Sequence, residues 1–484
     1  MSNSREKIRV LVAIASYGTR NDNYLRRLVN EYRSMSFDVE LIIVSNLDKS
    51  PYIGVETIVG LPNSNPWSLP FQHKKLFADR SKDYDLYIYT EDDMLVTERN
   101  LRAFLEVSSV LCPDEVAGFL RIERDVQGEF NFPEVHGYFH WESTSIRSRG
   151  SYTLAKFTNE HAAFYVLTRD QLQKALASGG FLVSPHEGKY DLLCSAATDP
   201  YTQCGLTKLI PISHLDDFTI HHLSDRYAGK FGVNRAELLA QIDVMLDLAA
   251  EETKARPLFA TETRVWRGLY SKDYYDGVSE DIVSAIPSHV RSVLSIGCGA
   301  GGTEGWLVQR GLDVAALPLD PVIARTAEMR GVKMVPGDFH EARKSLRGRT
   351  FDCILYLDVL HLLRDPVVAL SLFSENLASG AVVIIQTPNT LNLASLSKEL
   401  WHSRDLRIWR SFETTGVHRT SLGGIKDWCK ESGMKVEKAM HVVRHRTEIL
   451  RAFAPNFVSQ MFSPTLIAVA QRMAPVGQHS GTIK

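Results

Sequence analysis

The stretch VRSVLSIGCGAGGTEGWLVQRG, from Val290 to Gly311, decides the fold of the second half of this 484-residue chain. An apolar run leads into three spaced glycines, Gly297, Gly299 and Gly301, and a helical pattern follows. Glycines let the backbone turn sharply and approach a ligand, and the next helix offers unpaired N–H groups. The pattern predicts an α/β sheet with a small-molecule pocket at its edge, although dinucleotide-binding folds use the same turn.

Acidic residues after the next predicted strands narrow this choice. Asp320 ends VAALPLDP, where a carboxylate can accept hydrogen bonds from both hydroxyls of a ribose. VPGDF places Asp338 and Phe339 after a third short strand, and FDCILYLDVLHLLRDP (351–366) supplies a fourth. VVIIQTPNTLN (382–392) and a final TLIAVAQR add the last strands of one sheet.

Taken together, these motifs resemble the class I S-adenosylmethionine-dependent methyltransferases across residues 279–472. The resemblance implies a seven-stranded Rossmann-like sheet with the cofactor at its carboxyl edge. By this resemblance Gly297, Gly299 and Gly301 would line the methionine end of the cofactor. Asp320 would hold the ribose, and Asp338 with Phe339 would contact the adenine. The chain departs from the family at Leu317-Pro318-Leu319, where a glycine often precedes the acid.

Methyl transfer from a sulfonium is an in-line displacement, so a base is needed only when the acceptor is a hydroxyl. His361 follows the fourth predicted strand and is one candidate base; it could equally be a helix residue packed beneath the cofactor. His418 is the second candidate, in a loop that faces the substrate in related enzymes. Asp358 could orient the amine of the methionine.

In the first half, DYDLYIYTEDDMLVTERNLRAFLE (83–106) carries the clearest signal. An apolar strand runs into Glu91, Asp92 and Asp93 before a helix begins. Consecutive carboxylates repel one another unless a cation lies among them, and a divalent metal with a diphosphate is the usual partner. The alternative is an acidic turn that caps the helix N-terminus.

The order of these strands resembles the GT-A fold of nucleotide-sugar glycosyltransferases over residues 7–225. The resemblance implies that Mn²⁺ or Mg²⁺ is held by Glu91 and Asp93 together with His221 or His222. Adjacent residues of a strand point to opposite faces, so at most one histidine should reach the metal, and either could be purely structural. The residues implied for the nucleotide sugar are Ser16, Asp48 and Asp92.

A carboxylate must also take the proton of the acceptor hydroxyl in an inverting transfer. The Glu-Asp pair usual in the resembled fold is missing, because the matching stretch reads Gly188-Lys189-Tyr190-Asp191. We therefore expect Asp191 as the base, with Glu187 as the second choice. Inverting transfer, retaining transfer and an inactive domain all stay open.

The predicted fold class is α/β with two domains, each built on a parallel sheet. We expect a GT-A domain over 1–230, a helical linker over 231–262 that includes a helix at 233–255, a methyltransferase domain over 263–474 and a flexible tail over 475–484. The strands expected in the first domain are 8–15, 39–45, 55–59, 86–89, 116–121 and 162–167. Those expected in the second are 292–296, 314–319, 353–357, 382–386, 435–443 and 465–470.

Composition sets outer limits on the function. A formal net charge of -2 gives no reason to expect nucleic acid as the partner. The six cysteines lack CxxC spacing and are expected to be reduced, mostly buried thiols. The N-terminus lacks a signal-peptide pattern and no apolar run is long enough to span a membrane, which predicts a cytoplasmic protein. The amphipathic segment 448–462 could cover a site, contact a subunit or touch a membrane surface, or simply pack.

Together the two halves predict a bifunctional enzyme. One domain would add a sugar from a nucleotide sugar, and the other would methylate a hydroxyl of the same glycan or glycoconjugate, in a pathway such as bacterial surface-polysaccharide synthesis. A first alternative makes the N-terminal half a non-catalytic glycan-binding or scaffold module. A second makes the chain a methyltransferase for a small metabolite with an unrelated partner domain.

Overall fold

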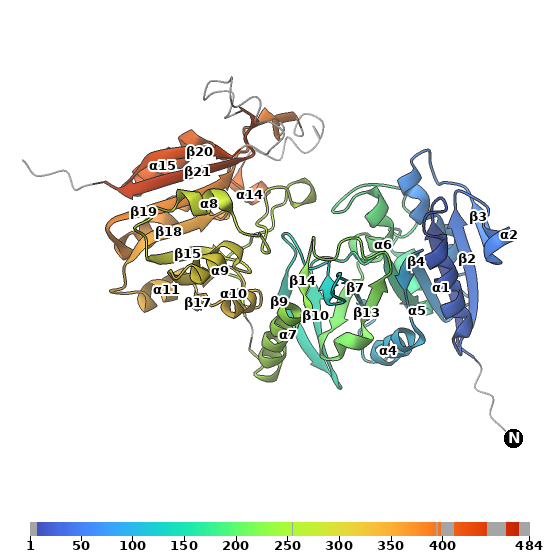
Figure 1. Ribbon diagram of the computed structural model, residues 1–484. Helices are drawn as coiled ribbons and strands as arrows, with labels where there is room; N and C mark the ends of the chain where they lie inside the picture. The colour runs from blue at the N-terminus through green and yellow to red at the C-terminus, as the bar shows by residue number, and fades with distance from the viewer. Residues whose placement is uncertain (1–6, 254, 394, 398–410, 443–460, 474–484) are drawn as a thin grey trace, which may run out of the picture. The chain divides into compact units, whose positions relative to one another are not determined.

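The computed structural model describes residues 7–253, 255–393, 395–397, 411–442 and 461–473. Contacts divide the chain into unit 1 (Met1–Ala255) and unit 2 (Arg256–Lys484), and both units combine strands with helices (Figure 1). The amphipathic segment expected at 448–462 lies almost wholly outside the described residues, and so does the tail expected at 475–484.

Unit 1 is built on a five-stranded sheet of order β11-β4-β1-β2-β3. Four strands are parallel, and β11 runs antiparallel to β4. The apolar run from Val10 to Ile14 in β1 is fully buried, as expected for a parallel strand covered on both faces. The strands are β1 (Arg9–Ser16), β2 (Asp38–Ser45), β3 (Glu56–Val59), β4 (Leu86–Glu91) and β11 (Phe164–Thr168).

Helices flank this sheet, and two of the helices of unit 1 start at capping boxes. Thr97 and Asn100 form a capping box at the start of α4, and Thr168 and Gln171 form one at α5. The helical segments are α1 (Asp22–Ser34), α2 (Ser50–Ile53), η1 (Pro66–Phe71), α3 (Gln72–Asp79), α4 (Glu98–Ser108), α5 (Arg169–Ala177) and α6 (Leu192–Thr202).

Unit 1 contains two further sheets, and one strand expected from the sequence is divided between them. The run at 116–121 is two strands, β6 and β7, which belong to different sheets. Gly118 lies where the chain crosses between them: its N–H donates to Leu209 O at 2.7 Å, and a Cβ there would lie 2.4 Å from the Lys208 side chain. The first sheet has the order β6 (Glu115–Ala117), β12 (Thr207–Pro211), β10 (Tyr152–Phe157), β9 (Trp141–Arg149). The second has the order β14 (Val233–Asn234), β8 (Phe130–Phe132), β7 (Leu120–Arg124), β13 (Thr219–His222), β5 (Met94–Leu95), and η2 (Ile212–Asp217) precedes β13.

The helix expected as part of a linker is α7 (Arg235–Ala250), and it packs as part of unit 1. Leu238, Ile242 and Met245 are buried, and the indole N–H of Trp141 on β9 donates to Gln241 Oε1 at 3.2 Å. The run of Ala, Leu and Glu predicted the helix. The strands on which the helix packs were not predicted from the sequence, so its packing in unit 1 was not predicted.

Unit 2 is built on a seven-stranded sheet of order β17-β16-β15-β18-β19-β21-β20. The first five strands in this order are parallel, and β21 runs antiparallel to both β19 and β20. The strands are β15 (Ser292–Cys298), β16 (Asp313–Pro318), β17 (Lys333–Met334), β18 (Phe351–Leu357), β19 (Leu377–Pro388), β20 (Met434–Val442) and β21 (Thr465–Arg472). This mixed sheet has the Rossmann-like form expected for the second half.

Both faces of the unit 2 sheet carry a hydrophobic core. Ile354 and Tyr356 of β18 belong to one buried cluster, and Cys353 and Leu355 belong to another, because side chains of a strand alternate between faces. Figure 1 shows α15 lying along β20 and β21. The helical segments are η3 (Trp266–Gly268), α8 (Glu280–Ala285), α9 (Gly302–Gln309), α10 (Ala324–Met329), α11 (Phe339–Ser345), η4 (Leu360–Leu362), α12 (Pro366–Leu372), η5 (Ser374–Asn376), α14 (Phe412–Thr415) and α15 (Leu422–Glu431).

All six cysteines are free thiols. Cys204, Cys298, Cys353 and Cys429 are buried, Cys194 is half-buried, and Cys112 is exposed. Among the residues that the structure describes, no helix combines the length and the apolar character needed to cross a membrane.

Candidate functional site

The glycine-rich turn of unit 2 connects β15 to α9. Gly297 and Gly301 have φ values of 83° and 75°, a left-handed backbone conformation that residues with a side chain rarely adopt. A Cβ on Gly297 would lie 2.5 Å from Val359 Cγ1, and one on Gly301 would lie 2.6 Å from Ala327 Cβ. These two positions therefore require glycine both for the turn and for packing beneath it.

The next glycines face the chain's own segment 274–277. A Cβ on Gly299 would lie 2.3 Å from Tyr274 O, and one on Gly302 would lie 2.2 Å from Asp276 O. The N–H of Ala300 donates to Tyr274 O at 2.7 Å. The close backbone approach that the sequence predicted for a ligand is thus made at Gly299 by this segment.

A cavity of about 310 Å³ lies beside the turn, and its charges come from separate parts of unit 2. Lys272 Nζ lies 3.1 Å from Asp276 Oδ2, and Ser295 Oγ donates to Glu304 Oε1 at 2.7 Å. The lysine and both carboxylates line the cavity, together with Gly299, Gly301, Gly302, Leu357 and Gln386. Asp273 and Asp281 line the same space, so carboxylates outnumber the one lysine around the cavity.

Asp320 follows β16 and is buried, with 1% of its surface exposed. Its Oδ1 accepts hydrogen bonds from the N–H groups of Val322 and Ile323, at 2.9 and 3.0 Å. The neighbouring Tyr274 has a raised pKa, first through burial and then through the charge of Asp320. Asp320 therefore lies close to the segment that covers the glycine turn.

Asp338 and Phe339 start α11. Asp338 is exposed and its carboxylate caps the helix, accepting from the N–H groups of His340 and Glu341 at 2.8 and 2.9 Å. The N–H of Glu341 holds the pKa of Asp338 below its usual value. Phe339 is stacked with Phe259, with ring centroids 6.3 Å apart and planes at 12°. Phe259, which the sequence did not single out, adds a second aromatic ring here.

Asp358 follows β18 in a left-handed conformation, with a φ of 54°. This conformation is rare for a residue with a side chain and often marks a functional position. Its Oδ2 accepts a short hydrogen bond from the side chain of Gln386, which lines the cavity. Burial lowers the pKa of Lys272, but the charges of Asp276 and then Asp358 outweigh this and raise it.

The two histidines proposed as bases differ in burial. His361 is buried, and its Nε2 lies 2.9 Å from Tyr270 O, while its Nδ1 has no hydrogen-bond partner within the described chain. Burial lowers the pKa of His361 to about 4. The Nε2 of His418 lies 2.9 Å from Leu363 O and 3.2 Å from Arg364 O. Both imidazoles therefore direct Nε2 at backbone carbonyl oxygens, and they differ in the deep burial of His361.

In unit 1 the three consecutive acids lie at the carboxyl end of β4. Asp92 accepts hydrogen bonds from Ser16 Oγ and from Asn21 Nδ2, the latter at 2.7 Å, and burial raises its pKa to about 6. Burial and the charge of Asp93 raise the pKa of Glu91 to about 8. Ser16 and Asp92, both expected at the nucleotide sugar, are therefore hydrogen-bonded to each other.

Asp93 lies against His222. Strand β13 pairs with β5 so that His222 faces Met94, and His222 Nε2 lies 3.0 Å from Asp93 Oδ2. Glu123 bonds the other ring nitrogen. Burial lowers the pKa of His222, but its bonds to Asp93 and Glu123 outweigh this and raise it to about 9. No group of three or more His, Cys, Asp or Glu suited to a metal occurs within the described ranges.

His221 and Asp48, which were also predicted for the site of unit 1, lie outside the pocket that contains the three acids. His221 points away from His222, and its Nε2 lies 2.9 Å from Asp225 Oδ1, in accord with the alternation of side chains along a strand. Asp48 is exposed, and its Oδ1 accepts from the N–H of Ser50 at 2.9 Å, which fixes the start of α2. Neither residue lines the pocket that contains the three acids.

That pocket has a volume of about 280 Å³ and includes Glu91, Asp92 and Asp93. Arg226 lines it as a cation opposite the acids, and Tyr17, Trp67 and Leu193 supply apolar surface. Arg226 follows β13 in DRYAG, a context that gave no sequence signal. Trp67 is the second residue of η1 and is 55% exposed, so its ring is available to a ligand.

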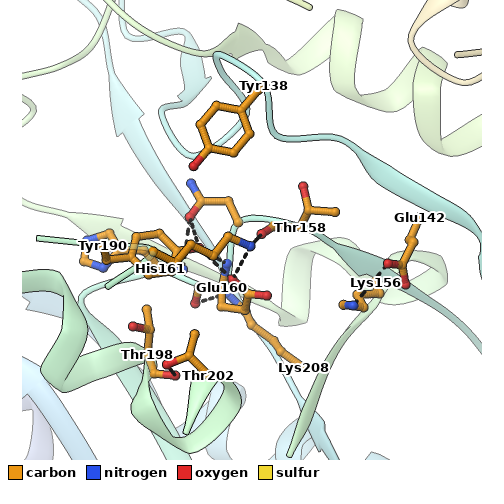
Figure 2. A network of polar contacts seen from close by, with 12 residues as sticks. Tyr138, Glu142, Lys156, Thr158, Glu160, His161, Tyr190, Thr198, Thr202 and Lys208 are labelled. Carbon is orange, nitrogen blue, oxygen red and sulfur yellow. Dashed lines mark hydrogen bonds and ion pairs between the residues drawn. The ribbon is translucent and has the colours of Figure 1, made fainter. Parts of the chain in front are cut away.

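Asp191 and Glu187, the two residues predicted as the base of the sugar transfer, lie in different environments. Asp191 is the N-cap of α6, and its Oδ1 accepts from the N–H of Cys194 at 2.9 Å. Glu187 is exposed in the preceding loop. A third carboxylate, Glu160, lies in the polar network of Figure 2, where Tyr190 OH donates to its Oε2 at 2.7 Å. No sequence pattern singled out Glu160.

Comparisons with known proteins bear on unit 2. Residues 269–439, less than half of the chain, match the model of a methyltransferase-domain family, so this region is a methyltransferase domain. No curated protein matches the chain. Similar solved structures include the mitomycin 7-O-methyltransferase MmcR, with 19% identity over 40% of this chain and 52% of that one, and a TM-score of 0.29.

Two further solved structures are similar. One is the O-methyltransferase NcsB1 from neocarzinostatin biosynthesis in complex with S-adenosylmethionine, with 19% identity over 38% of this chain and 49% of that one, and a TM-score of 0.27. The other is a SAM-dependent methyltransferase from Archaeoglobus fulgidus, with 18% identity, 40% and 95% coverage, and a TM-score of 0.31. The chain spans about half the length of MmcR and NcsB1.

Proposed function

We propose that unit 2 is an S-adenosylmethionine-dependent O-methyltransferase. The observation that carries the proposal is the methyltransferase-domain match over 269–439, which includes both the glycine-rich turn and most of the cavity beside it. Small-molecule sites typically have volumes of about 300–1,000 Å³, and this cavity lies at the lower end of that range.

The residues around the cavity fit the parts of the cofactor. Its amino-acid end is a zwitterion, and the cavity offers both a cation, Lys272, and carboxylates, Asp276 and Glu304. Asp320 is the buried carboxylate at the end of β16 and would accept the ribose hydroxyls. Phe339 and Phe259 would provide the apolar surface for the adenine.

S-adenosylmethionine, when bound, supplies the methyl group. The chain must then remove the proton of the acceptor hydroxyl, and we assign this role to His361. Burial keeps its imidazole neutral near pH 7, and the bond to Tyr270 O places the proton on Nε2. Nδ1 therefore carries a lone pair that no described group uses. His418, which faces carbonyl oxygens, would position the neighbouring loop.

Equilibrium binding tests the proposal without knowledge of the acceptor. S-adenosylmethionine and S-adenosylhomocysteine should bind the full chain and displace one another, because they share the nucleoside and the amino-acid end. NAD should not displace either compound, which separates this pocket from a dinucleotide site. Failure of both sulfur nucleosides to bind at millimolar concentration would contradict the proposal.

For unit 1 we propose a nucleotide-sugar glycosyltransferase of the GT-A type. Support comes from the parallel strands β3-β2-β1-β4 with β11 antiparallel at the edge, and from the acidic pocket at their carboxyl ends. Ser16 and Asp92 would contact the nucleoside, and Arg226 the diphosphate. The acceptor would be a glycan or glycoconjugate that unit 2 also modifies, in a pathway such as surface-polysaccharide synthesis in the cytoplasm.

The donor set around Asp93 fits a divalent metal only in part. Asp93 Oδ2 and His222 Nε2 converge, and Glu123 supports the imidazole from behind, as a carboxylate often does for a metal-bound histidine. A third protein ligand is lacking in the described part of the chain, so diphosphate oxygens and water would have to complete the sphere. A bound metal would neutralise the diphosphate, and Glu91, expected as a ligand, lines the same pocket.

Release of nucleoside diphosphate from a panel of UDP-, GDP- and dTDP-sugars, with and without Mn²⁺, tests this second proposal. Turnover that needs Mn²⁺ and is lost in Asp93→Ala would support a glycosyltransferase. The alternative is a glycan-binding or scaffold module, favoured by the mutual contact of Asp93 and His222. That module would show no turnover and unchanged glycan binding in Asp93→Ala.

A further inference from the structure

The segment 160–163 runs beside the acidic pocket of unit 1. Strand β11 begins at Phe164 and pairs antiparallel with β4, and the N–H of Glu91 donates to Ala163 O at 3.1 Å. The residues just before β11 therefore lie at the same sheet edge as Glu91 and its acidic neighbours. Ala163 has a φ of 53°, a strained conformation of the kind that structures keep at functional positions.

Glu160 is held firmly at this edge, at the centre of Figure 2. Its Oε2 accepts from Tyr190 OH at 2.7 Å and from Lys189 Nζ at 3.0 Å. Its own N–H donates to Tyr190 OH at 2.8 Å, and its backbone O accepts from Lys208 Nζ at 3.1 Å. Four contacts thus fix both the backbone and one carboxylate oxygen.

The second oxygen of this carboxylate is not engaged. Oε1 makes no hydrogen bond within the part of the chain that the structure describes, and 13% of the side chain is exposed. Glu160 therefore presents one carboxylate oxygen, in a fixed orientation, that can accept a proton.

The two carboxylates expected for this role are less suited to it. Asp191 uses Oδ1 to cap α6, where Asp is among the preferred N-cap residues for structural reasons alone. Glu187 is exposed in a loop. The residues Lys189 and Tyr190 that precede Asp191 instead hold Glu160, so the stretch that lacks the expected Glu-Asp pair serves a carboxylate from another segment.

We propose that Glu160 is the base of the sugar transfer, an inference that rests on the glycosyltransferase proposed for unit 1. The acceptor oxygen forms a bond to the anomeric carbon while the bond from that carbon to the diphosphate oxygen breaks. The diphosphate leaves with the electron pair, and the proton of the acceptor hydroxyl moves to Glu160 Oε1. Asp191 positions α6 and does not take the proton.

Hydrolysis of the best donor from the nucleotide-sugar panel tests this assignment, with water as the acceptor and the full chain as the enzyme. Glu160→Gln should lower the release of nucleoside diphosphate by a factor of about 100 or more, the usual contribution of a general base. Glu160→Asp should recover part of this loss. Asp191→Asn, which keeps an N-cap side chain, should stay within about threefold of the wild type, because Asn caps helices as well as Asp.

Two controls separate the base from a structural role and from failure of the underlying function. Glu142→Gln, on an exposed carboxylate paired with Lys156 in the same unit, should leave turnover unchanged. The Kd of UDP with Mn²⁺ should be the same in Glu160→Gln and in the wild type. Full turnover in Glu160→Gln, or loss of UDP binding, would overturn the role of Glu160 alone. Absence of wild-type turnover across the panel would overturn the glycosyltransferase and this role with it.

Discussion

Each unit gathers carboxylates at the carboxyl edge of a sheet, but the two units neutralise them differently. In unit 1, Glu91, Asp92 and Asp93 are consecutive, and burial of neighbouring acids raises the pKa of the first two. In unit 2, Asp276 is paired with Lys272 and Glu304 accepts from Ser295, and Asp273 and Asp281 also line the cavity, so carboxylates outnumber the cation there too. In both units the excess of carboxylates suits a ligand that brings positive charge.

The two units also differ in how far apart their site residues lie in the sequence. In unit 2 the glycine turn, Asp320 and Asp338 lie on successive elements, and a family match covers them. In unit 1 the pocket combines Asn21, Asp93 and Arg226, which are far apart in the sequence. A site assembled from distant segments leaves only weak sequence patterns, so its residues emerge only once the strands are paired.

The prediction with the largest expected effect tests whether unit 1 unfolds independently of unit 2. Lys74 and Asp199 form an ion pair whose side chains are 3% and 0% exposed. Lys74→Met leaves the carboxylate buried without its cation, so we expect a loss of about 3–5 kcal/mol in the free energy of unfolding of unit 1.

Lys156→Met is the matched control, because its partner Glu142 is 41% exposed and such pairs contribute about 0–1 kcal/mol. Denaturant titration with probes in each unit checks both variants. The unit 2 transition should not move; a common shift of both transitions would show that the units unfold together.

A pH dependence should distinguish unit 2. The pKa of His361 is about 4 in the fold, against a usual value of 6.5, so the unfolded chain binds more protons between these values. Stability should therefore fall as the pH falls from 6.5 to 4, by up to about 3 kcal/mol from this group.

Chemical unfolding of unit 2 at pH 7 and at pH 4.5, in the wild type and in His361→Gln, measures this contribution. The variant should lose less stability on acidification than the wild type. His289→Gln, at an exposed position, should behave like the wild type. Equal acid sensitivity in all three proteins would contradict the assignment of a buried neutral imidazole.

Gly299→Ala tests the covering segment. The new Cβ would lie 2.3 Å from Tyr274 O, which is backbone, so the segment or the turn must shift. We expect a loss of about 1–3 kcal/mol, the usual range for overpacking, and weaker binding of S-adenosylhomocysteine.

Gly423→Ala provides the matched control. Its nearest contact would be Ser421 Oγ at 3.7 Å, and it lies within α15, where alanine is preferred to glycine. Thermal unfolding and equilibrium binding should show no loss in this variant. A harmless Gly299→Ala would mean that segment 274–277 is not held against the turn.

Much of the fold could be predicted from local patterns. Apolar runs such as Val10–Ile14 and Leu294–Ile296 marked buried strands, and the glycine turn marked the edge of the second sheet. The crossing at Gly118 could not be predicted, because it depends on Lys208 and Leu209, which approach from a distant segment. Short strands such as β8 and β14 were missed because their pairing, rather than their composition, defines them.

The candidate sites show the same division. Asp93 and either His221 or His222 were expected at one metal by resemblance, and the pairing of β13 with β5 brings His222 against Asp93. Glu304 and Glu160 were missed because their roles depend on partners, Ser295 for one and Lys189 with Tyr190 for the other. Asp48 and His221 were predicted from position along the chain, but the structure places both outside the pocket.

The most direct test of the central claim is calorimetric titration of S-adenosylmethionine into the wild type and Asp320→Asn. Asn keeps the Oδ1 that accepts from Val322 and Ile323, but removes the charge that would hold the ribose. The account predicts binding to the wild type and a Kd about 10–100 times higher in the variant, the usual effect of losing charged hydrogen bonds. Asp313→Asn, at an exposed carboxylate, should bind like the wild type. Equal affinity in Asp320→Asn and the wild type, or no binding to either, would contradict the account.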